Sequence, residues 1–175
     1  MTQKQIIIDV QIKSKVWKNI KNIKNFVDKT CKNLILETEL KKFLTGKKSL
    51  EMTVSLVCDA QIKKINQEFR AKNKATDVLS FPFLDEKLIR KNGLQNTIKN
   101  QQILILGDIV LSLEKSRSES MKSEKTFHNH LTHLLLHSIL HLIGFDHENK
   151  KDAKIMEELE IKILRKFNIE NPYKA

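Results

Sequence analysis

The segment His137–His147, which reads HSILHLIGFDH, carries three histidines at a spacing that can hold a metal ion. His137 and His141 are four residues apart in an apolar run, so on a helix they lie on one face, roughly 40° apart around the axis. Gly144 tolerates a positive φ and can end that helix, and a short turn can then return His147 to the same point. Three histidines with one open coordination position are the pattern of a catalytic zinc site.

The alternative is three ordinary histidines near a helix end, where the helix dipole favours a positive charge. The metal site is the stronger interpretation because two histidines at ligand spacing, then a glycine and a third histidine, form a zincin-type signature. A zinc ion held by neutral imidazoles keeps a water in its fourth position and lowers the pKa of that water toward about 7. The segment therefore predicts metal-assisted chemistry with one Zn²⁺.

The same spacing occurs in metzincin proteases, whose motif is HExxHxxGxxH. Those enzymes place a glutamate general base directly after the first histidine, whereas this chain has Ser138 there. A serine hydroxyl cannot replace a carboxylate base near neutral pH. A metalloprotease is therefore a weaker interpretation of the motif.

A long helix from about Thr126 to Ile143 is expected to position these ligands, and it bears five of the six histidines. His133 lies one turn before His137 on the same stripe. It is either a structural residue or a group that supports the metal site or contacts substrate. His128 and His130 are expected to be exposed.

Four other segments have the pattern of β-strands, namely Ile6–Val10, Leu50–Val57, Asp77–Phe83 and Ile103–Leu111. Pro82 cannot donate to a ladder, so the third strand should lie at a sheet edge or end there. The fourth is the most apolar, so we expect it to be central. Asp108 interrupts it, and a buried aspartate needs a partner. Either it bonds backbone at a bulge beside Gly107, or it orients a functional group.

Three more segments space their apolar residues as helices do. The first, Val16–Leu34, has lysines on its other faces, which form either a solvated side or an RNA-facing one. The second, Ala60–Phe69, is capped by Asp59 and closed by Arg70 in its last turn. The third, Lys151–Phe167, is expected to turn inward Ile155, Met156, Leu159, Ile163, Leu164 and Phe167, with Glu158 and Lys162 as an outward pair.

The remaining segments are less patterned. Leu84–Gln102 is expected to be a surface excursion with a weak hairpin, and Ser112–Ser118 a short helix followed by a polar link. Together the elements predict one α+β domain, residues 1–175, with a mixed four-stranded sheet packed with helices and a zincin-like metal helix.

The formal charge of +11 and the sequence pI of about 9.6 indicate a polyanionic partner. Residues 1–50 hold twelve lysines but only four acidic residues. Nucleic acid is the first expectation, an anionic membrane surface the second and a merely solubilising lysine face the third.

No apolar run approaches a membrane span, and the N-terminus lacks the features of a signal peptide, so a cytoplasmic location is expected. Cys31 and Cys58 offer no disulfide framework, which agrees with a reducing compartment. We expect them to be small buried residues, with metal ligation a remote alternative.

Three blocks in the chain, taken in order, resemble the YbeY family of bacterial rRNA maturation factors, which are zinc-dependent endoribonucleases. The family motif HGxLHLxGYDH matches residues 137–147, with departures at Ser138 and Phe145, neither of which removes a ligand. The second block is N-x-x-[YF]-R followed by TDVLSFP, here Asn66, Phe69 and Arg70 and then Thr76–Pro82. The third is LGDI at Leu106–Ile109. The resemblance covers roughly residues 50–167, whereas the basic segment 1–49 matches only in general plan.

The resemblance implies an enzyme that cleaves single-stranded RNA in 16S rRNA 3′-end maturation and ribosome quality control. Its partners would be small-subunit rRNA, the ribosome, and a ribosomal protein or an rRNA-processing GTPase, with no membrane. Arg70 would line the active-site cleft, and its guanidinium can hold a phosphodiester by two hydrogen bonds and offset charge in the transition state. Supporting or substrate-contacting groups would be His133, Ser138, Asp146 and Asp108.

RNA carries its own 2′-hydroxyl as a nucleophile, so the missing glutamate is less damaging to a nuclease than to a peptidase. A zinc-dependent endoribonuclease is therefore the first hypothesis. A non-catalytic ribosome assembly factor, with a structural metal and a lysine face docked on RNA or a ribosomal protein, is the second. A metalloprotease is the third.

Overall fold

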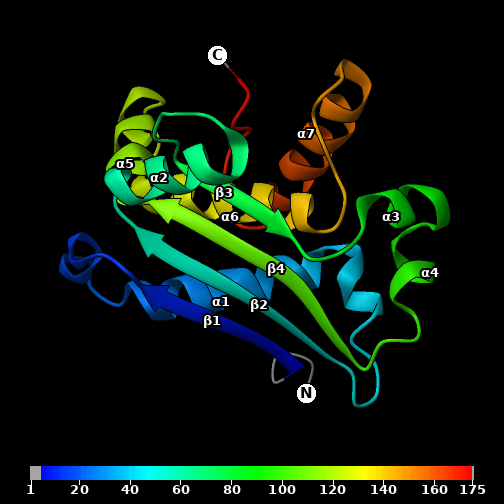
Figure 1. Cartoon of the computed structure of the whole chain (residues 1–175). Helices are drawn as coiled ribbons and strands as arrows, with labels where there is room; N and C mark the ends of the chain where they lie inside the picture. Colours follow the sequence, from blue (N-terminus) through cyan, green and yellow to red (C-terminus); the bar gives the residue numbers. More distant parts are fainter. Residues whose placement is uncertain (1–4, 175) are drawn as a thin grey trace.

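The computed structural model describes residues 5–174 of the chain. The strands in this part form one mixed sheet. In spatial order they are β1 (Ile6–Ile12), β2 (Ser49–Val57), β4 (Ile103–Ser112) and β3 (Val78–Pro82), as Figure 1 shows. β1, β2 and β4 are parallel, and β3 runs antiparallel to β4. The predicted α+β fold is confirmed, with the most apolar strand inside the sheet and the Pro82 strand at its edge.

One face of the sheet is covered by α1 (Ile23–Glu37) and α6 (Phe127–Leu142), which lie behind the strands in Figure 1. Alternate residues of each strand point into this core, because successive side chains of a strand face opposite sides. On β2 they are Leu50, Met52, Val54 and Leu56, all buried.

Within the described part of the chain, α2 (Asp59–Arg70) covers one end of the other face. There Ile62 of α2 packs with Val57, Leu79 and Val110 in a small second core. The rest of this face, which we call the open sheet face, carries Ile7, Asp9, Glu51, Thr53, Ile103, Ile105 and Asp108. Phe81 lies at its border, packed against the second core. Asp108 is exposed on the open sheet face, so the prediction of a buried aspartate with a partner is wrong. The register shift near Met52 and Gly107 turns its side chain to the open side.

The segment Leu84–Gln102 is helical, not a hairpin. It forms α3 (Glu86–Asn92) and α4 (Leu94–Ile98), joined at Gly93 with a φ of 77°. Asp85 caps α3 by accepting hydrogen bonds from two backbone amides. Two short amphipathic turns replace the hairpin because they bury Ile89, Leu94 and Ile98. These apolar residues were too widely spaced to reveal a helix in the sequence.

The first helix starts later than predicted. Trp17 is fully buried, and its Nε1 donates a 2.7 Å hydrogen bond to the carbonyl of Val57. It belongs to a separate 3₁₀ helix, η2 (Lys15–Asn19), and Asn22 then adopts a left-handed φ of 58° before α1 begins. Asparagine tolerates that conformation better than most residues, so the helix breaks there. A second 3₁₀ helix, η3 (Glu39–Lys42), follows α1.

Two other helix boundaries differ from the predictions. Cys58, not Asp59, is the N-cap of α2, and Gln61 completes the capping box. The carboxylate of Asp59 instead accepts hydrogen bonds from the hydroxyl of Ser112 and the amide of Lys115. α5 (Leu113–Lys122) continues through part of the predicted polar link, where Lys115 pairs with Glu119 at 3.2 Å.

The last helix, α7 (Lys150–Arg165), is close to its predicted position. Ile155, expected to face inward, is 46% exposed, and Glu158 lies 3.9 Å from Lys154 instead of pairing with Lys162. Cys31 is buried, Cys58 is half-buried, and both are free thiols. Among the described residues, no helix is long and apolar enough to cross a membrane.

Candidate metal centre

The three histidines of the motif converge, as predicted. His137 and His141 lie on α6 with their Nε2 atoms 3.1 Å apart. α6 ends at a turn in which Gly144 has a φ of 94° and Phe145 donates its amide to the carbonyl of Leu140. This turn returns His147, so that one ligand nitrogen from each ring lies within 4.8 Å of the others.

The Nδ1 atoms of the two helical histidines are held by fixed acceptors. His137 Nδ1 lies 2.8 Å from Oε1 of Glu160, and His141 Nδ1 lies 2.9 Å from the carbonyl oxygen of Phe145. A carbonyl and a carboxylate only accept, so both Nδ1 atoms carry the proton. The Nε2 lone pairs therefore face each other, which fits a divalent ion bound by neutral imidazoles.

The electrostatics favour the same protonation states. Burial, together with the nearby His137 and His147, lowers the pKa of His141 to about 4, so its imidazole is neutral near pH 7. Burial alone would raise the pKa of Glu160. Hydrogen bonds from His133 and His137 outweigh that effect and lower the pKa to about 2. The buried carboxylate is thus charged behind the ligands.

Glu160 is the main residue that sequence reasoning missed. It belongs to α7, its side chain is fully buried, and it accepts hydrogen bonds from His137, from His133 Nε2 at 3.3 Å and from the hydroxyl of Tyr173. The available signal was its position between Met156 and Leu164, four residues from each, on the buried stripe of an amphipathic helix. A carboxylate on such a stripe needs a partner.

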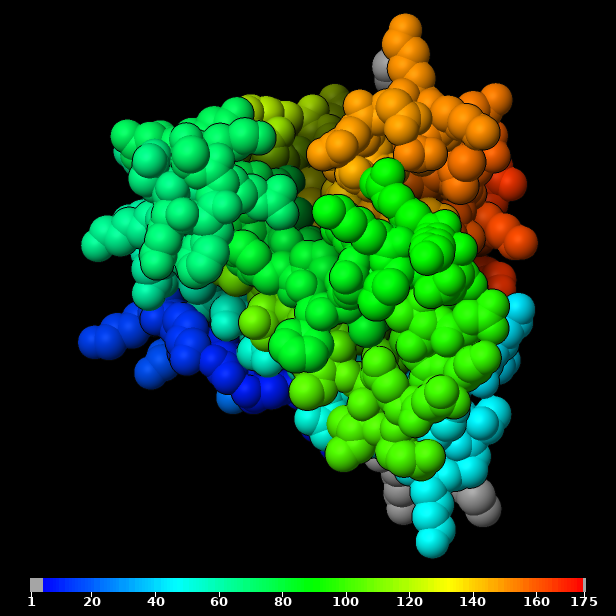
Figure 2. Space-filling view, turned by 45° about the vertical axis from the view of Figure 1, so that its right-hand side comes forward, coloured from blue at the N-terminus to red at the C-terminus, as the bar shows by residue number. Residues whose placement is uncertain are grey.

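Arg70 shares a cleft of about 480 Å³ with the three histidines. Its Nη2 donates a 2.9 Å hydrogen bond to the carbonyl of Ser80 on the edge strand β3. Figure 2 shows the hollow between the teal-green lobe of residues 60–76 and the orange lobe of residues 145–155. The other lining residues are Lys72, Thr76, Asp77, Val78, Leu79, Ser80, Pro82, Glu86, Asp146 and Glu148.

Of the other candidate residues, one lines the cleft and the rest lie outside it. Asp146 lines the cleft and accepts a 2.7 Å hydrogen bond from the amide of His147. His133 does not line the cleft. It contacts Glu160, and its ring lies edge-on to that of His137, with the centroids 6.3 Å apart. Ser138 is fully buried and does not line the cleft, and Asp108 lies on the open sheet face.

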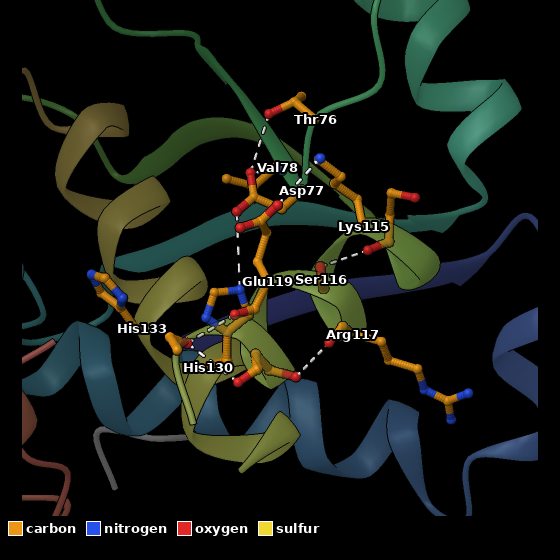
Figure 3. A network of polar contacts seen from close by, with 12 residues as sticks. Thr76, Asp77, Val78, Lys115, Ser116, Arg117, Glu119, His130 and His133 are labelled. Carbon is orange, nitrogen blue, oxygen red and sulfur yellow. Dashed lines mark hydrogen bonds and ion pairs between the residues drawn. The ribbon is translucent and has the colours of Figure 1, made fainter. Parts of the chain in front are cut away.

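His130, expected to be exposed, is buried, with 8% of its surface accessible, whereas His128 is exposed. The ring of His130 faces the carboxylate of Asp77, with 4.0 Å between Nε2 and Oδ2 (Figure 3). Burial lowers the pKa of His130. Its position follows from the packing of α5 and β3 against the start of α6, which the sequence alone does not reveal.

These observations define an α+β protein with a three-histidine candidate metal centre at the end of a buried helix, beside an arginine-lined cleft. The family model described as Endoribonuclease YbeY matches residues 9–168, and the chain belongs to this family. The resemblance inferred from the three sequence blocks is confirmed.

Curated relatives named Endoribonuclease YbeY match over most of their length. The protein from Buchnera aphidicola is 39% identical over 90% of both chains. Those from Bartonella henselae and Bartonella quintana are 35% and 36% identical over 96% of this chain and 97% of theirs. The solution structure of TM1509 from Thermotoga maritima aligns over 96% of both chains, with 22% identity and a TM-score of 0.48.

Proposed function

We propose that this chain is a zinc-dependent endoribonuclease that cleaves single-stranded RNA in the cytoplasm, in 16S rRNA 3′-end maturation and ribosome quality control. The main support is the convergence of three histidine nitrogens, two of them oriented by Nδ1 acceptors, in a cleft that also holds Arg70. Family membership supports RNA as the substrate. The expected partners are small-subunit rRNA, the ribosome, and a ribosomal protein or an rRNA-processing GTPase.

His137, His141 and His147 would hold the ion, and Glu160 and the Phe145 carbonyl would keep the first two rings in place. When bound, zinc supplies a Lewis acid and lowers the pKa of a coordinated water. Arg70 uses one guanidinium nitrogen on Ser80, and its remaining N–H groups can hold a phosphodiester and offset charge in the transition state.

Proton transfer does not depend on a glutamate beside the first ligand. Ser138, at that position, is buried outside the cleft. The cleft instead carries the carboxylates of Asp77, Glu86, Asp146 and Glu148, and RNA brings its own 2′-hydroxyl. A carboxylate within reach of that hydroxyl can accept its proton.

The proposal is tested by incubating the purified chain with single-stranded RNA, double-stranded RNA and casein, each with zinc and with a chelator. Cleavage of single-stranded RNA that needs zinc is expected. It should be lost in the His137→Ala, His141→Ala double variant and kept in His128→Ala, which removes an exposed histidine of the same helix. Activity that persists in the double variant would come from a contaminant and would refute the proposal.

Arg70→Glu should slow RNA cleavage by about 10²- to 10³-fold, because enzymes that lose one hydrogen-bond donor to the transition state lose about that much in kcat. Zinc content should not change, because Arg70 contacts Ser80 and none of the ligands. Arg117→Glu, on α5, is the control for a generic loss of positive charge. A fully active Arg70→Glu protein would remove Arg70 from the site.

A non-catalytic assembly factor is the second candidate. The exposed lysines of α1 favour it, because they lie outside the cleft and suit docking to a large RNA. Tight RNA binding without cleavage in the presence of zinc would support this candidate over the nuclease.

A further inference from the structure

Three phenylalanines, two of them exposed, are chain neighbours of residues that line the cleft. Phe69 is 63% exposed and Phe83 is 72% exposed. Phe81 is half-buried, and its ring packs edge-to-face on that of Phe69 with the centroids 5.4 Å apart. Isolated exposed apolar residues are common, but a packed pair of aromatic rings with a third, exposed phenylalanine two residues along the chain suggests a binding surface.

The position of these rings follows from the geometry of β3. Most of β3 lines the cleft, but Phe81 does not. Phe81 pairs with Asp108 and packs against the small second core at the border of the open sheet face. Phe83 continues the pairing, since its amide donates to the carbonyl of Leu106. Phe81 and Phe83 are therefore on one side of the strand, roughly 7 Å apart along it. Phe69 directly precedes Arg70 on α2, and Phe81 and Phe83 flank Pro82, so all three are chain neighbours of residues that line the cleft.

We propose that Phe69, Phe81 and Phe83, here called the aromatic platform, bind the bases of single-stranded RNA whose backbone enters the cleft. This inference rests on the proposed function and adds the place where bases flanking the cleavage point would stack. Exposed aromatic rings on a sheet stack on unpaired bases with little sequence preference. Duplex RNA keeps its bases paired and stacked, so the platform would select single strands.

The charges around the platform favour this orientation of the strand. Arg70 and Lys72 lie on the cleft side, where they can meet phosphates. Asp108 lies beside Phe81 in the register, so phosphates are repelled from the platform itself. A carboxylate at that point can accept a hydrogen bond from an exocyclic amino group of a base. Bases on the platform and phosphates in the cleft are therefore the complementary arrangement.

The test measures binding of a labelled single-stranded oligoribonucleotide to the zinc-loaded full chain by fluorescence anisotropy, read before measurable cleavage. Phe83→Ala should weaken binding by about tenfold, within the range for loss of one stacked base. Phe83→Trp should keep the RNA affinity of the unmodified chain. Phe83→Leu, whose side chain is apolar but has no ring, should weaken RNA binding as Phe83→Ala does. Met121→Ala, at a 73% exposed residue of α5, should bind as the unmodified chain does.

An oligonucleotide with abasic positions identifies the interaction as stacking. The unmodified chain should bind it more weakly than the intact oligonucleotide, and Phe83→Ala should show a smaller difference between the two. Equal affinity of the unmodified chain, Phe83→Ala and Phe83→Leu for intact RNA would overturn the platform. The platform would also be overturned if Phe83→Ala changed self-association, measured by sedimentation velocity, and left RNA affinity unchanged.

The same experiment separates the platform from the proposed function. If the chain cleaves RNA but substitution of Phe83 does not change its RNA affinity, the nuclease proposal stands and the platform is rejected. Ring-dependent RNA binding without any cleavage would keep the platform and reject the nuclease. Absence of RNA binding by the unmodified chain would reject the platform whatever its catalytic activity.

Discussion

At the scale of single residues, Glu160 supports the candidate metal centre from behind. Its buried carboxylate binds Nδ1 of His137, which leaves Nε2 of that ring free for a metal ion. The sequence predicted the three ligands because helix geometry fixes the relation of residues four apart. It could not predict Glu160, because the contact depends on how α7 is rotated against α6.

Glu160→Gln should weaken zinc binding by about 10- to 100-fold, the usual cost of losing a hydrogen-bond partner of a ligand. The amide keeps the shape of the side chain but removes the charge that favours the Nδ1 proton of His137. Competition with a chromophoric chelator measures the affinity. Glu158→Gln, an exposed position of the same helix, is the control. Equal zinc affinity in both variants would contradict the supporting role of Glu160.

Ser138 gives a prediction about stability. Its side chain is fully buried, and its hydroxyl has no hydrogen-bond partner among the described residues. Ser138→Ala should therefore stabilise the chain by about 1–2 kcal/mol, since an unpaired polar group is removed and alanine favours the helix. Urea unfolding measures the change.

The control for Ser138 is Ser116→Ala. Ser116 is also buried on a helix, but its hydroxyl donates to the carbonyl of Ser112. We expect that variant to be no more stable than the unmodified chain. Stabilisation of similar size in both variants would mean that helix propensity alone explains the effect.

At the scale of elements, the segment that follows α7 closes over the back of the candidate metal centre. The hydroxyl of Tyr173 donates to Glu160, and Lys125 Nζ donates a 2.8 Å hydrogen bond to the carbonyl of Pro172. Burial and the nearby charge of Glu160 raise the pKa of the Tyr173 hydroxyl. The hydroxyl therefore stays protonated and acts as a donor near neutral pH.

Tyr173→Phe should reduce zinc affinity less than Glu160→Gln does, because Glu160 keeps its contacts with His133 and His137. The free energy of unfolding should fall by about 0.5–1.5 kcal/mol for the lost hydrogen bond. Chelator competition and urea unfolding of the same samples measure both quantities. A loss of zinc affinity as large as that of Glu160→Gln would make Tyr173 the main determinant of the Glu160 position.

The elements themselves were predicted to different extents. The strands and the long helices follow periods of 2 and 3.6 residues, so their existence was visible in the sequence. Their boundaries depend on single contacts, such as the Trp17 bond to Val57 and the left-handed Asn22, which no periodicity contains. α3 and α4 were missed because their buried residues are few and become apolar anchors only against the folded core.

At the scale of the whole molecule, positively charged residues occupy two separate regions, which should bind RNAs of different length. Arg70 and Lys72 lie in the cleft, whereas Lys24 and Lys29 are exposed on α1, across the sheet from α2. A short oligonucleotide that fills the cleft and the aromatic platform would not reach α1. A large folded RNA can contact both, and each phosphate contact makes its affinity more dependent on salt.

Lys24→Glu with Lys29→Glu should therefore leave the affinity for a short single-stranded oligonucleotide unchanged and weaken binding of a long small-subunit rRNA fragment. The slope of log affinity against log salt should become shallower by about 0.7–0.9 for each lost phosphate contact. Lys72→Glu, in the cleft, should instead weaken binding of both RNAs. If reversal of the α1 lysines changes neither affinity nor slope, the lysine face is a solvated surface, and the cleft side of the molecule alone accounts for its attraction to RNA.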